Sequence, residues 1–501
     1  MVARCVKAWN PKVLDMKTAL NQRRAGVLLH ITSLPSRNLG QDAYRFVDFL
    51  KNSGVTVWQV LPLGITHDDG SPYQSLSAHA GNPALIDFKA LLEKGWLTKE
   101  EFCVSCQNAT FHHSCLLNKA FDGFQEQATA DEKVDFKEFC DINAYWLDDF
   151  VMFMALRQKF NQASWNTWAD EYKNRYRATL NDVRFALKFS MASIKFEQYI
   201  FFKQWIALKT YANDRGILLF GDIPIFVSYD SVDVWANRDV FKLNSKGEMS
   251  VVAGVPPDYF SETGQRWGNP HYDWNYLKYT KFKWWIERMQ TQVTLFDVVR
   301  IDHFRGLESA WEIPVNEPTA MTGEWVLAEG DDLLTALTTQ FPNVTLIAED
   351  LGIITDEVNT LRIKFDLAGM KIMQFAFSGE SDNPHLPENH EVNCVVYTGT
   401  HDNDTTVGWE SSLDENQRSQ VNKALNLDES ANIPQALMRF TLNSVAKLAI
   451  LPMQDILEIG SSNRMNTPGT TWGNWQWTFN WEQIPSDCSA RLAMLIHEAN
   501  R

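Results

Sequence analysis

Short apolar runs recur along the chain, and several of them stop abruptly at acidic side chains. The clearest is the β-branched run that begins at Val298 and ends at Asp302 and His303. Strands covered on both faces of a parallel sheet are nearly continuous in Val, Ile and Leu, so these runs predict buried parallel strands. Eight strands are expected, over residues 26–31, 55–63, 217–226, 295–302, 344–350, 371–377, 394–404 and 448–453.

Between these runs, apolar residues recur at the three- and four-residue intervals typical of helices. The first such segment places Ala43, Phe46, Val47 and Leu50 on one face and stops at Gly54. Alternating strands and helices predict an α/β fold, a (β/α)8 TIM barrel. A doubly wound open sheet is the second choice, and no glycine-rich phosphate loop favours it.

The second and third strands are separated by about 150 residues, far more than an ordinary βαβ unit needs. Residues 145–160 and 196–215 carry helical patterns in this stretch. We therefore expect a mostly helical insertion subdomain over residues 65–216 and a catalytic barrel formed by residues 1–64 and 217–501. After the third strand, residues 252–274 are rich in Gly, Pro and aromatic side chains and predict a long lid loop.

Charge and composition narrow the function. The 46 basic and 62 acidic side chains give a net charge of −16, which argues against nucleic acid and an anionic membrane surface as partners and favours a neutral substrate. No apolar run approaches the ~20 residues of a membrane span, and the first residues lack the apolar core of a secretory signal. Seven scattered Cys are typical of a reducing compartment. These features predict a cytoplasmic protein.

One stretch contains residue types that zinc prefers, namely Cys103, Cys106, His112, His113 and Cys115. A zinc module normally has two well-spaced ligand pairs, which this stretch lacks. Free thiols on the surface are therefore expected, and we predict no metal and no cofactor.

Three of the predicted strands end in carboxylates, namely Asp302, Glu349 and Asp402. The carboxyl ends of barrel strands meet at one face, where active sites lie. Retaining cleavage of a glycosidic bond uses a carboxylate nucleophile and a carboxylic acid about 5–5.5 Å apart, and their environments separate their pKa values. A structural ion pair would explain one such carboxylate, but it does not explain their recurrence at three strand ends.

Five motifs resemble the 4-α-glucanotransferases, or amylomaltases, of glycoside hydrolase family 77, and the resemblance runs from about Arg24 to Trp477. It implies that Asp302 is the nucleophile, Glu349 the general acid/base and Asp402 the stabiliser of the transition state. The motifs are Arg300–Gly306, Ala348–Ile353, Tyr397–Asp404, Ser71–Ala78 and Gly254–Phe260.

The same resemblance implies a set of substrate-binding residues. Tyr73 would stack on a donor sugar, and Asp222 would lie at the base of the cleft. The lid and the strand ends would supply the others: Asp258, Tyr259, Phe260, Gln265, Trp267, Arg300, His303 and His401. Arg300 would hold the nucleophile ionised. The alternative for each aromatic residue is that it only packs against its neighbours.

Two loops depart from the family pattern. Residues 33–37 run directly into residues 38–42, where the family has a longer glycine-rich turn, and the loop over residues 66–70 is atypical. The expected activity is transfer of α-1,4-glucan segments between maltooligosaccharides, with glucose as a further acceptor. The alternatives are an α-1,4-glucan hydrolase of the same clan and a non-catalytic glycan-binding barrel, which the three intact carboxylates argue against.

Overall fold

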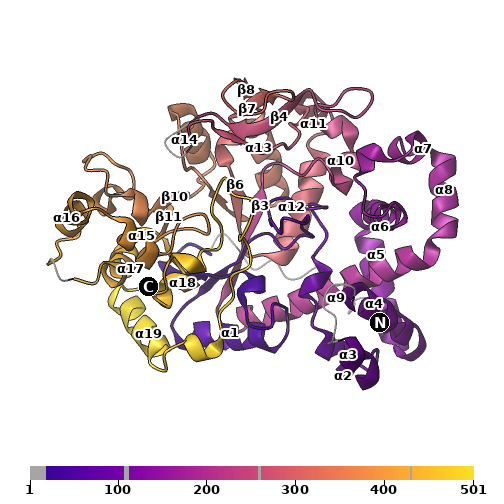
Figure 1. The fold of residues 1–501 in the computed structure, drawn as a ribbon, viewed down its shortest axis with the longest axis horizontal. Coiled ribbons are helices and arrows are strands. Elements are labelled where there is room, and N and C mark those ends of the chain that lie inside the picture. The colour runs from indigo at the N-terminus through magenta and orange to yellow at the C-terminus, as the bar shows by residue number, and fades with distance from the viewer. Residues whose placement is uncertain (1–18, 106–111, 258–260, 429–430) are drawn as a thin grey trace.

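The computed structural model describes residues 19–105, 112–257, 261–428 and 431–501 (Figure 1). Eight parallel strands form one sheet in the order β10-β11-β12-β1-β2-β3-β6-β9. The N–H of Ala348 at the end of β9 donates to the carbonyl of Ala368, directly before β10, at 2.8 Å, so the sheet closes on itself. The predicted (β/α)8 barrel is confirmed.

Each of the eight predicted barrel strands overlaps an observed one. The largest boundary difference is at β11, which was predicted to run to residue 404 and ends at Tyr397. At β10, Met373–Phe375, predicted as strand, forms a 3-10 helix. The strands are β1 (Arg24–Leu28), β2 (Val57–Gln59), β3 (Leu218–Pro224), β6 (Val298–Asp302), β9 (Thr345–Ala348), β10 (Gly369–Ile372), β11 (Cys394–Tyr397) and β12 (Leu448–Pro452).

Helices surround this barrel. In α1 the predicted face of Ala43, Phe46, Val47 and Leu50 is fully buried, as a period of 3.6 residues requires. The helices outside the stretch between β2 and β3 are α1 (Gln41–Asn52), α10 (Val232–Ala236), α11 (Trp274–Tyr279), α12 (Lys283–Leu295), α13 (Gly330–Gln340), α14 (Asp356–Lys364), α15 (Thr406–Ser412), α16 (Glu415–Ala424), α17 (Ile433–Asn443), α18 (Met453–Ile456) and α19 (Cys488–Glu498).

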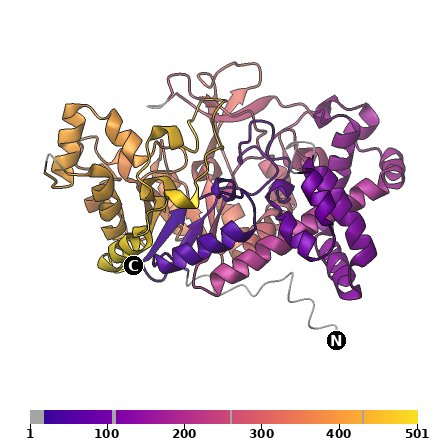
Figure 2. The ribbon, with the colours of Figure 1, turned by 60° about the horizontal axis from the view of Figure 1, so that its bottom comes forward.

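The described residues between β2 and β3 form helices and loops, and none of these residues belongs to a strand of either sheet. They gather at one side of the barrel, opposite α15, α16, α17 and α19 (Figures 1 and 2). The last helix begins at Lys188, eight residues before its predicted start. These helices are α2 (Phe88–Glu93), α3 (Lys99–Ser105), α4 (His112–Gln127), α5 (Ala130–Ile142), α6 (Ala144–Lys159), α7 (Asp170–Lys173), α8 (Arg177–Ala186) and α9 (Lys188–Asn213).

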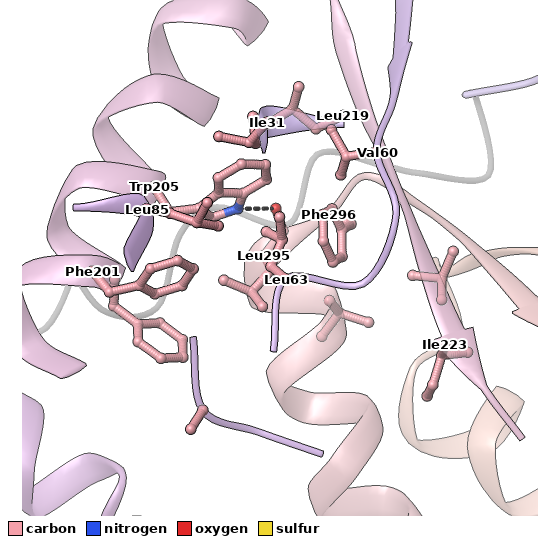
Figure 3. Close-up of a cluster of buried hydrophobic side chains, with 14 of the residues drawn as sticks. Ile31, Val60, Leu63, Leu85, Phe201, Trp205, Leu219, Ile223, Leu295 and Phe296 are labelled. Carbon is pink, nitrogen blue, oxygen red and sulfur yellow. Dashed lines mark hydrogen bonds between the residues drawn. The ribbon is translucent and has the colours of Figure 1, made fainter. Parts of the chain in front are cut away.

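An apolar cluster joins α9 to the barrel (Figure 3). The Trp205 indole N–H donates to the carbonyl of Leu295 at 2.8 Å, and its ring meets Phe296 edge-on with centroids 5.6 Å apart. A Cβ on Gly221 in β3 would come within 2.2 Å of the Phe296 ring, so this close approach requires glycine. The helix α9 is therefore packed closely against β3 and the residues that precede β6.

A second, antiparallel sheet has the order β5-β4-β7-β8 and was not predicted. Two of its strands, β4 and β5, overlap the predicted lid loop over residues 252–274, so the described part of that loop contains two antiparallel strands that were not expected. Its strands are β4 (Val251–Val255), β5 (Gln265–Arg266), β7 (Ser309–Pro314) and β8 (Glu324–Leu327). Figure 1 shows β4, β7 and β8 together at the top of the view.

Candidate active site

Arg300 occupies the centre of the site, where it binds two carboxylates. Its Nη2 lies 2.9 Å from Oδ1 of Asp302, two residues further along β6 and so on the same face of the strand. Its Nη1 donates to both carboxylate oxygens of Asp222, at 2.8 and 2.7 Å. The strand register places Asp222 of β3 directly beside Arg300. One guanidinium therefore fixes a buried carboxylate below and a partly exposed one at the mouth.

Tyr73 is bound to the same group of charges. Its hydroxyl donates to Oδ2 of Asp222 at 2.7 Å, and its ring stacks on His401 with centroids 5.2 Å apart. Trp475 packs against both rings, with centroids 6.0 Å from Tyr73 and 5.9 Å from His401. Burial and the Asp222 charge raise the pKa of Tyr73 well above its usual value, so the phenol is a proton donor. The structure thus brings Tyr73, Asp222, Arg300, Asp302 and His401 together, as expected.

Glu349 directly follows β9, and the backbone holds its carboxylate. Its Oε2 accepts from the N–H of His303 at 2.7 Å, and its Oε1 accepts from the N–H of Leu351 at 3.0 Å. His303 has a left-handed backbone, with a φ of 52°, which accompanies the turn of the chain at the end of β6. Two backbone donors on neighbouring strand ends therefore fix Glu349 next to Asp302.

The electrostatics of these carboxyls are linked. Burial raises the pKa of Asp302, the Arg300 guanidinium lowers it, and the charges of Asp222, Glu349 and Asp402 raise it. Burial also raises the pKa of Glu349, whereas Arg300 and the backbone N–H groups of Leu351 and His303 lower it. Each of the two carboxyls therefore titrates under the influence of the other, because a charge on one disfavours a charge on the other.

Asp402 lies after β11 and is bound from the segment that follows β12. The Asn466 amide donates to its Oδ1 at 2.6 Å, and Arg464 donates to its backbone carbonyl at 2.9 Å. His401 Nε2 is 3.4 Å from its other carboxylate oxygen. The side chain remains 46% exposed, so its free surface faces the mouth rather than the core.

Trp267 directly follows β5 of the second sheet and lies beside His303. The indole meets the His303 ring edge-on at 4.8 Å, and its N–H donates to the side chain of Gln265 at 3.2 Å. Within the described residues, Nε2 of His303 is buried without a hydrogen-bond partner. Burial lowers the pKa of His303 to about 3, so the ring is neutral and one of its nitrogens is available to a hydroxyl group.

Three expected residues cannot be placed in this site, and three residues of the site were not expected. Asp258, Tyr259 and Phe260 lie outside the described residues. Trp475, Asn466 and Arg464 were missed, although they belong to a Gly-, Pro- and Trp-rich segment of the same composition as residues 252–274. That composition is the signal in the sequence that could have identified Trp475, Asn466 and Arg464.

Both loops that depart from the family pattern border Trp475. The Arg37 guanidinium donates to the carbonyl of Gln476 at 2.6 Å. A Cβ on Gly70 would lie 4.0 Å from that of Trp475. Both loops therefore lie beside the segment that contains Trp475 and Gln476.

Two further observations concern metal binding and membrane-spanning helices. The described residues contain no group of three or more His, Cys, Asp or Glu side chains that could hold a metal ion, and Cys106 lies outside them. Among the helices of the described ranges, none is long and apolar enough to cross a membrane. The predicted absence of a metal stays a prediction.

A closed parallel barrel with acidic side chains gathered at the carboxyl ends of β3, β6, β9 and β11 defines a class of protein. It is a (β/α)8 enzyme whose mouth has the residue types required for chemistry at a glycosidic bond. Comparison with known proteins identifies the family within this class.

Residues 29–483 match the model of a glycoside hydrolase family 77 described as 4-alpha-glucanotransferase. A 4-alpha-glucanotransferase from Thermus thermophilus is 44% identical over 497 residues, which cover 96% of this chain and 99% of the relative. A chloroplastic/amyloplastic 4-alpha-glucanotransferase from Solanum tuberosum is 41% identical, over 96% of this chain and 85% of its own length. The chain belongs to the 4-α-glucanotransferase family, and it is an enzyme that transfers segments of α-1,4-glucan.

A solved structure is also close to this fold. The amylomaltase from Streptococcus agalactiae in complex with acarbose has a TM-score of 0.92 and 36% sequence identity, and the match covers 96% of this chain and all of the other. The arrangement of strands and helices around the mouth is therefore that of the family.

Proposed function

We propose that this enzyme transfers glucan segments by retaining double displacement, with Asp302 as the nucleophile, Glu349 as the general acid/base and Asp402 as the stabiliser of the transition state. The proposal rests on one observation: the two neighbouring carboxyls have different binding partners. Asp302 contacts the Arg300 guanidinium at 2.9 Å, whereas backbone N–H groups hold Glu349. The ion pair with Arg300 stabilises an ionised Asp302. Because the charge of Asp302 disfavours a second charge beside it, the proton then belongs on Glu349.

In the first step, the Asp302 carboxylate attacks the anomeric carbon of the donor sugar. The bond to the glycosidic oxygen breaks, and Glu349 gives its proton to that oxygen as the donor's reducing-end segment leaves. In the second step, the ionised Glu349 takes the proton from the 4-hydroxyl of an acceptor glucan, whose oxygen attacks the same carbon and releases Asp302. Two inversions give net retention, and the protein returns to its starting protonation state.

The surrounding side chains orient the sugars. Asp402 presents a half-exposed carboxylate that accepts hydrogen bonds from ring hydroxyls, and Nε2 of His303 is free to bind another. Tyr73 has its hydroxyl bound to Asp222 and one face on His401, which leaves its opposite face for a donor sugar. Asp222 and Arg300 serve as buried supports of this arrangement.

Transfer requires that an acceptor glucan compete with water for the glycosyl intermediate. The β4–β5 hairpin supports this competition because it holds Trp267 beside His303, where an indole face can bind an acceptor sugar. Orientation of a bound acceptor contributes up to several kcal/mol to such a step. The substrates are α-1,4-glucans and maltooligosaccharides, and glucose is a further acceptor.

We also propose that residues 65–216 form a helical insertion subdomain beside a catalytic barrel of residues 1–64 and 217–501, and that the enzyme acts in the cytoplasm. The helices between β2 and β3 support the first proposal. Free Cys115, Cys140, Cys394 and Cys488 support the second, since thiols persist in reducing compartments.

The test of transfer against hydrolysis uses maltotriose alone. A transferase produces glucose and a ladder of longer glucans while the number of reducing ends stays nearly constant. A hydrolase produces a steady rise in reducing ends with no longer products. The second outcome would contradict the proposed role of the hairpin and of Trp267.

A further inference from the structure

The loop over residues 467–474 is anchored to the mouth at both ends. Before it, the N–H of Asn466 donates to the carbonyl of His401 at 3.1 Å, and the Asn466 side chain binds Asp402. After it, Trp475 packs on Tyr73 and His401. The loop therefore begins and ends on residues that line the mouth, and its tip stands at the rim.

Internal bonds fix the shape of this loop. The Asn474 side-chain oxygen accepts from the N–H of Thr467 at 3.0 Å, and its amide donates to the carbonyl of Thr470 at 3.0 Å. Gly469 and Gly473 have φ values of +78° and +81°, which side chains other than glycine rarely adopt. A loop closed in this way presents its tip in one orientation.

At the tip, Trp472 exposes 89% of its surface. It lies three positions before Trp475 in the chain, so the two Cα atoms lie within about 11 Å of each other. An exposed indole contributes no free energy of burial to folding, and most Trp side chains in folded proteins are well buried. The same loop thus supplies one indole to the inside of the mouth and holds another outside it.

We propose that Trp472 is a stacking platform for glucosyl units of long α-1,4-glucans that extend beyond the mouth on the side of Tyr73 and Asp402. This inference rests on the proposed function, because it requires a glucan chain to leave the mouth at that rim. The apolar C–H face of a glucosyl ring covers the indole, and the burial of that surface stabilises the bound chain. Maltotriose is too short to use the platform once it occupies the sites beside Asp302.

The test compares amylose with maltotriose as the substrate. In Trp472→Ser, KM for amylose rises about threefold to tenfold, since the apolar contact is lost, while kcat stays near that of the unmodified protein. Both constants for maltotriose stay within about twofold. The substitution removes only a contact with sugars far from the reacting bond, and maltotriose does not make that contact. Trp472→Phe keeps an aromatic face and recovers most of the affinity for amylose.

Phe185→Ser is the matched control. Phe185 is 81% exposed on α8, one of the helices between β2 and β3, which gather at one side of the barrel. Its substitution therefore removes an exposed aromatic ring away from the mouth. KM values for both substrates are expected to stay unchanged in this variant.

Two results overturn the platform: an unchanged KM for amylose in Trp472→Ser, or an equal rise in KM for maltotriose. Unmodified protein that fails to disproportionate maltotriose would instead contradict the proposed function. The two failures are distinguishable because the second appears before any substitution at residue 472.

Discussion

The two walls of the mouth are built in different ways. The barrel wall consists of Asp222, Arg300, Asp302 and Glu349 at the ends of β3, β6 and β9, and each of its carboxylates is held by a guanidinium or by backbone N–H groups. The loop wall consists of three aromatic rings that lie outside the strands, namely Tyr73, Trp267 and Trp475.

This difference assigns two tasks to the two walls. Charges fixed on rigid strands stabilise a transition state, because no reorganisation is needed when the reaction occurs. In the proposed mechanism, the aromatic rings of the loop wall bind the apolar faces of sugars and select the acceptor. Substitutions in the barrel wall are therefore expected to change the rate, and substitutions in the loop wall to change the products.

The largest effect is expected from the two reacting carboxyls. Asp302→Asn and Glu349→Gln each lower kcat for maltotriose by about a thousandfold or more, because each removes a chemical step rather than a core contact. The melting temperature and the far-UV circular dichroism spectrum of both variants should match those of the unmodified protein. Activity within about tenfold of the unmodified protein in either variant would refute the assignment of the barrel wall.

Arg300→Met comes next, and it affects both stability and activity. It leaves the buried Asp222 without its cation, which costs about 3–5 kcal/mol of folding free energy when one partner of a buried pair is removed. Arg300 lowers the pKa of Asp302, so its loss raises that pKa, and ionised Asp302 then requires a higher pH.

The matched measurements for Arg300→Met are urea unfolding and the pH profile of kcat/KM. The acidic limb of the profile is expected to move to higher pH than in the unmodified protein. A limb that stays in place or moves to lower pH would show that Arg300 does not control the ionisation of the nucleophile.

Tyr73→Phe tests the contact between the two walls. It keeps the ring on His401 and removes the 2.7 Å hydrogen bond to Asp222. A hydrogen bond to a charged group contributes about 1.5–3 kcal/mol to folding stability, so the free energy of unfolding should fall by about that amount. kcat/KM should also fall, because the Tyr73 ring and Asp222 lose the bond that fixes them to each other. Tyr73→Ala serves as the comparison, because it also removes the stacking surface and should raise KM further. Equal kinetics for the two variants would mean that the ring face binds no sugar.

The smallest effect on rate is expected from Trp267→Ala in the loop wall. Cleavage of maltotriose should stay within about tenfold of the unmodified rate, while the ratio of transfer to hydrolysis falls because the acceptor loses its binding surface. Product sizing together with a reducing-end assay measures this ratio. An unchanged ratio would contradict the division of tasks between the walls.

The sequence predicted the barrel wall much better than the loop wall, and the reason is physical. Buried parallel strands produce continuous apolar runs that end at the mouth, so Asp302 and Glu349 are recognisable from residues next to them in the chain. β10 was predicted less accurately because its apolar run continues into a 3-10 helix.

The loop wall depends on contacts between distant segments. β4 pairs with β7 about sixty residues later, and β5 contains Gln265 and Arg266 alone, so no local alternation identifies the second sheet. Asn466 and Trp475 acquire their roles from Asp402, His401 and Tyr73, which no pattern in their own segment specifies.

The most direct test of the central claim is to trap the sugar on the nucleophile. Glu349→Gln is incubated with α-maltosyl fluoride, whose leaving group departs without a proton, so that the first step proceeds while the second lacks its base. Peptide mass spectrometry is then expected to find one maltosyl group on the peptide that contains Asp302, and none when Asp302→Asn is added to the same variant. Release of fluoride with the sugar attached to another residue, or with no attached sugar at any time, would contradict the account.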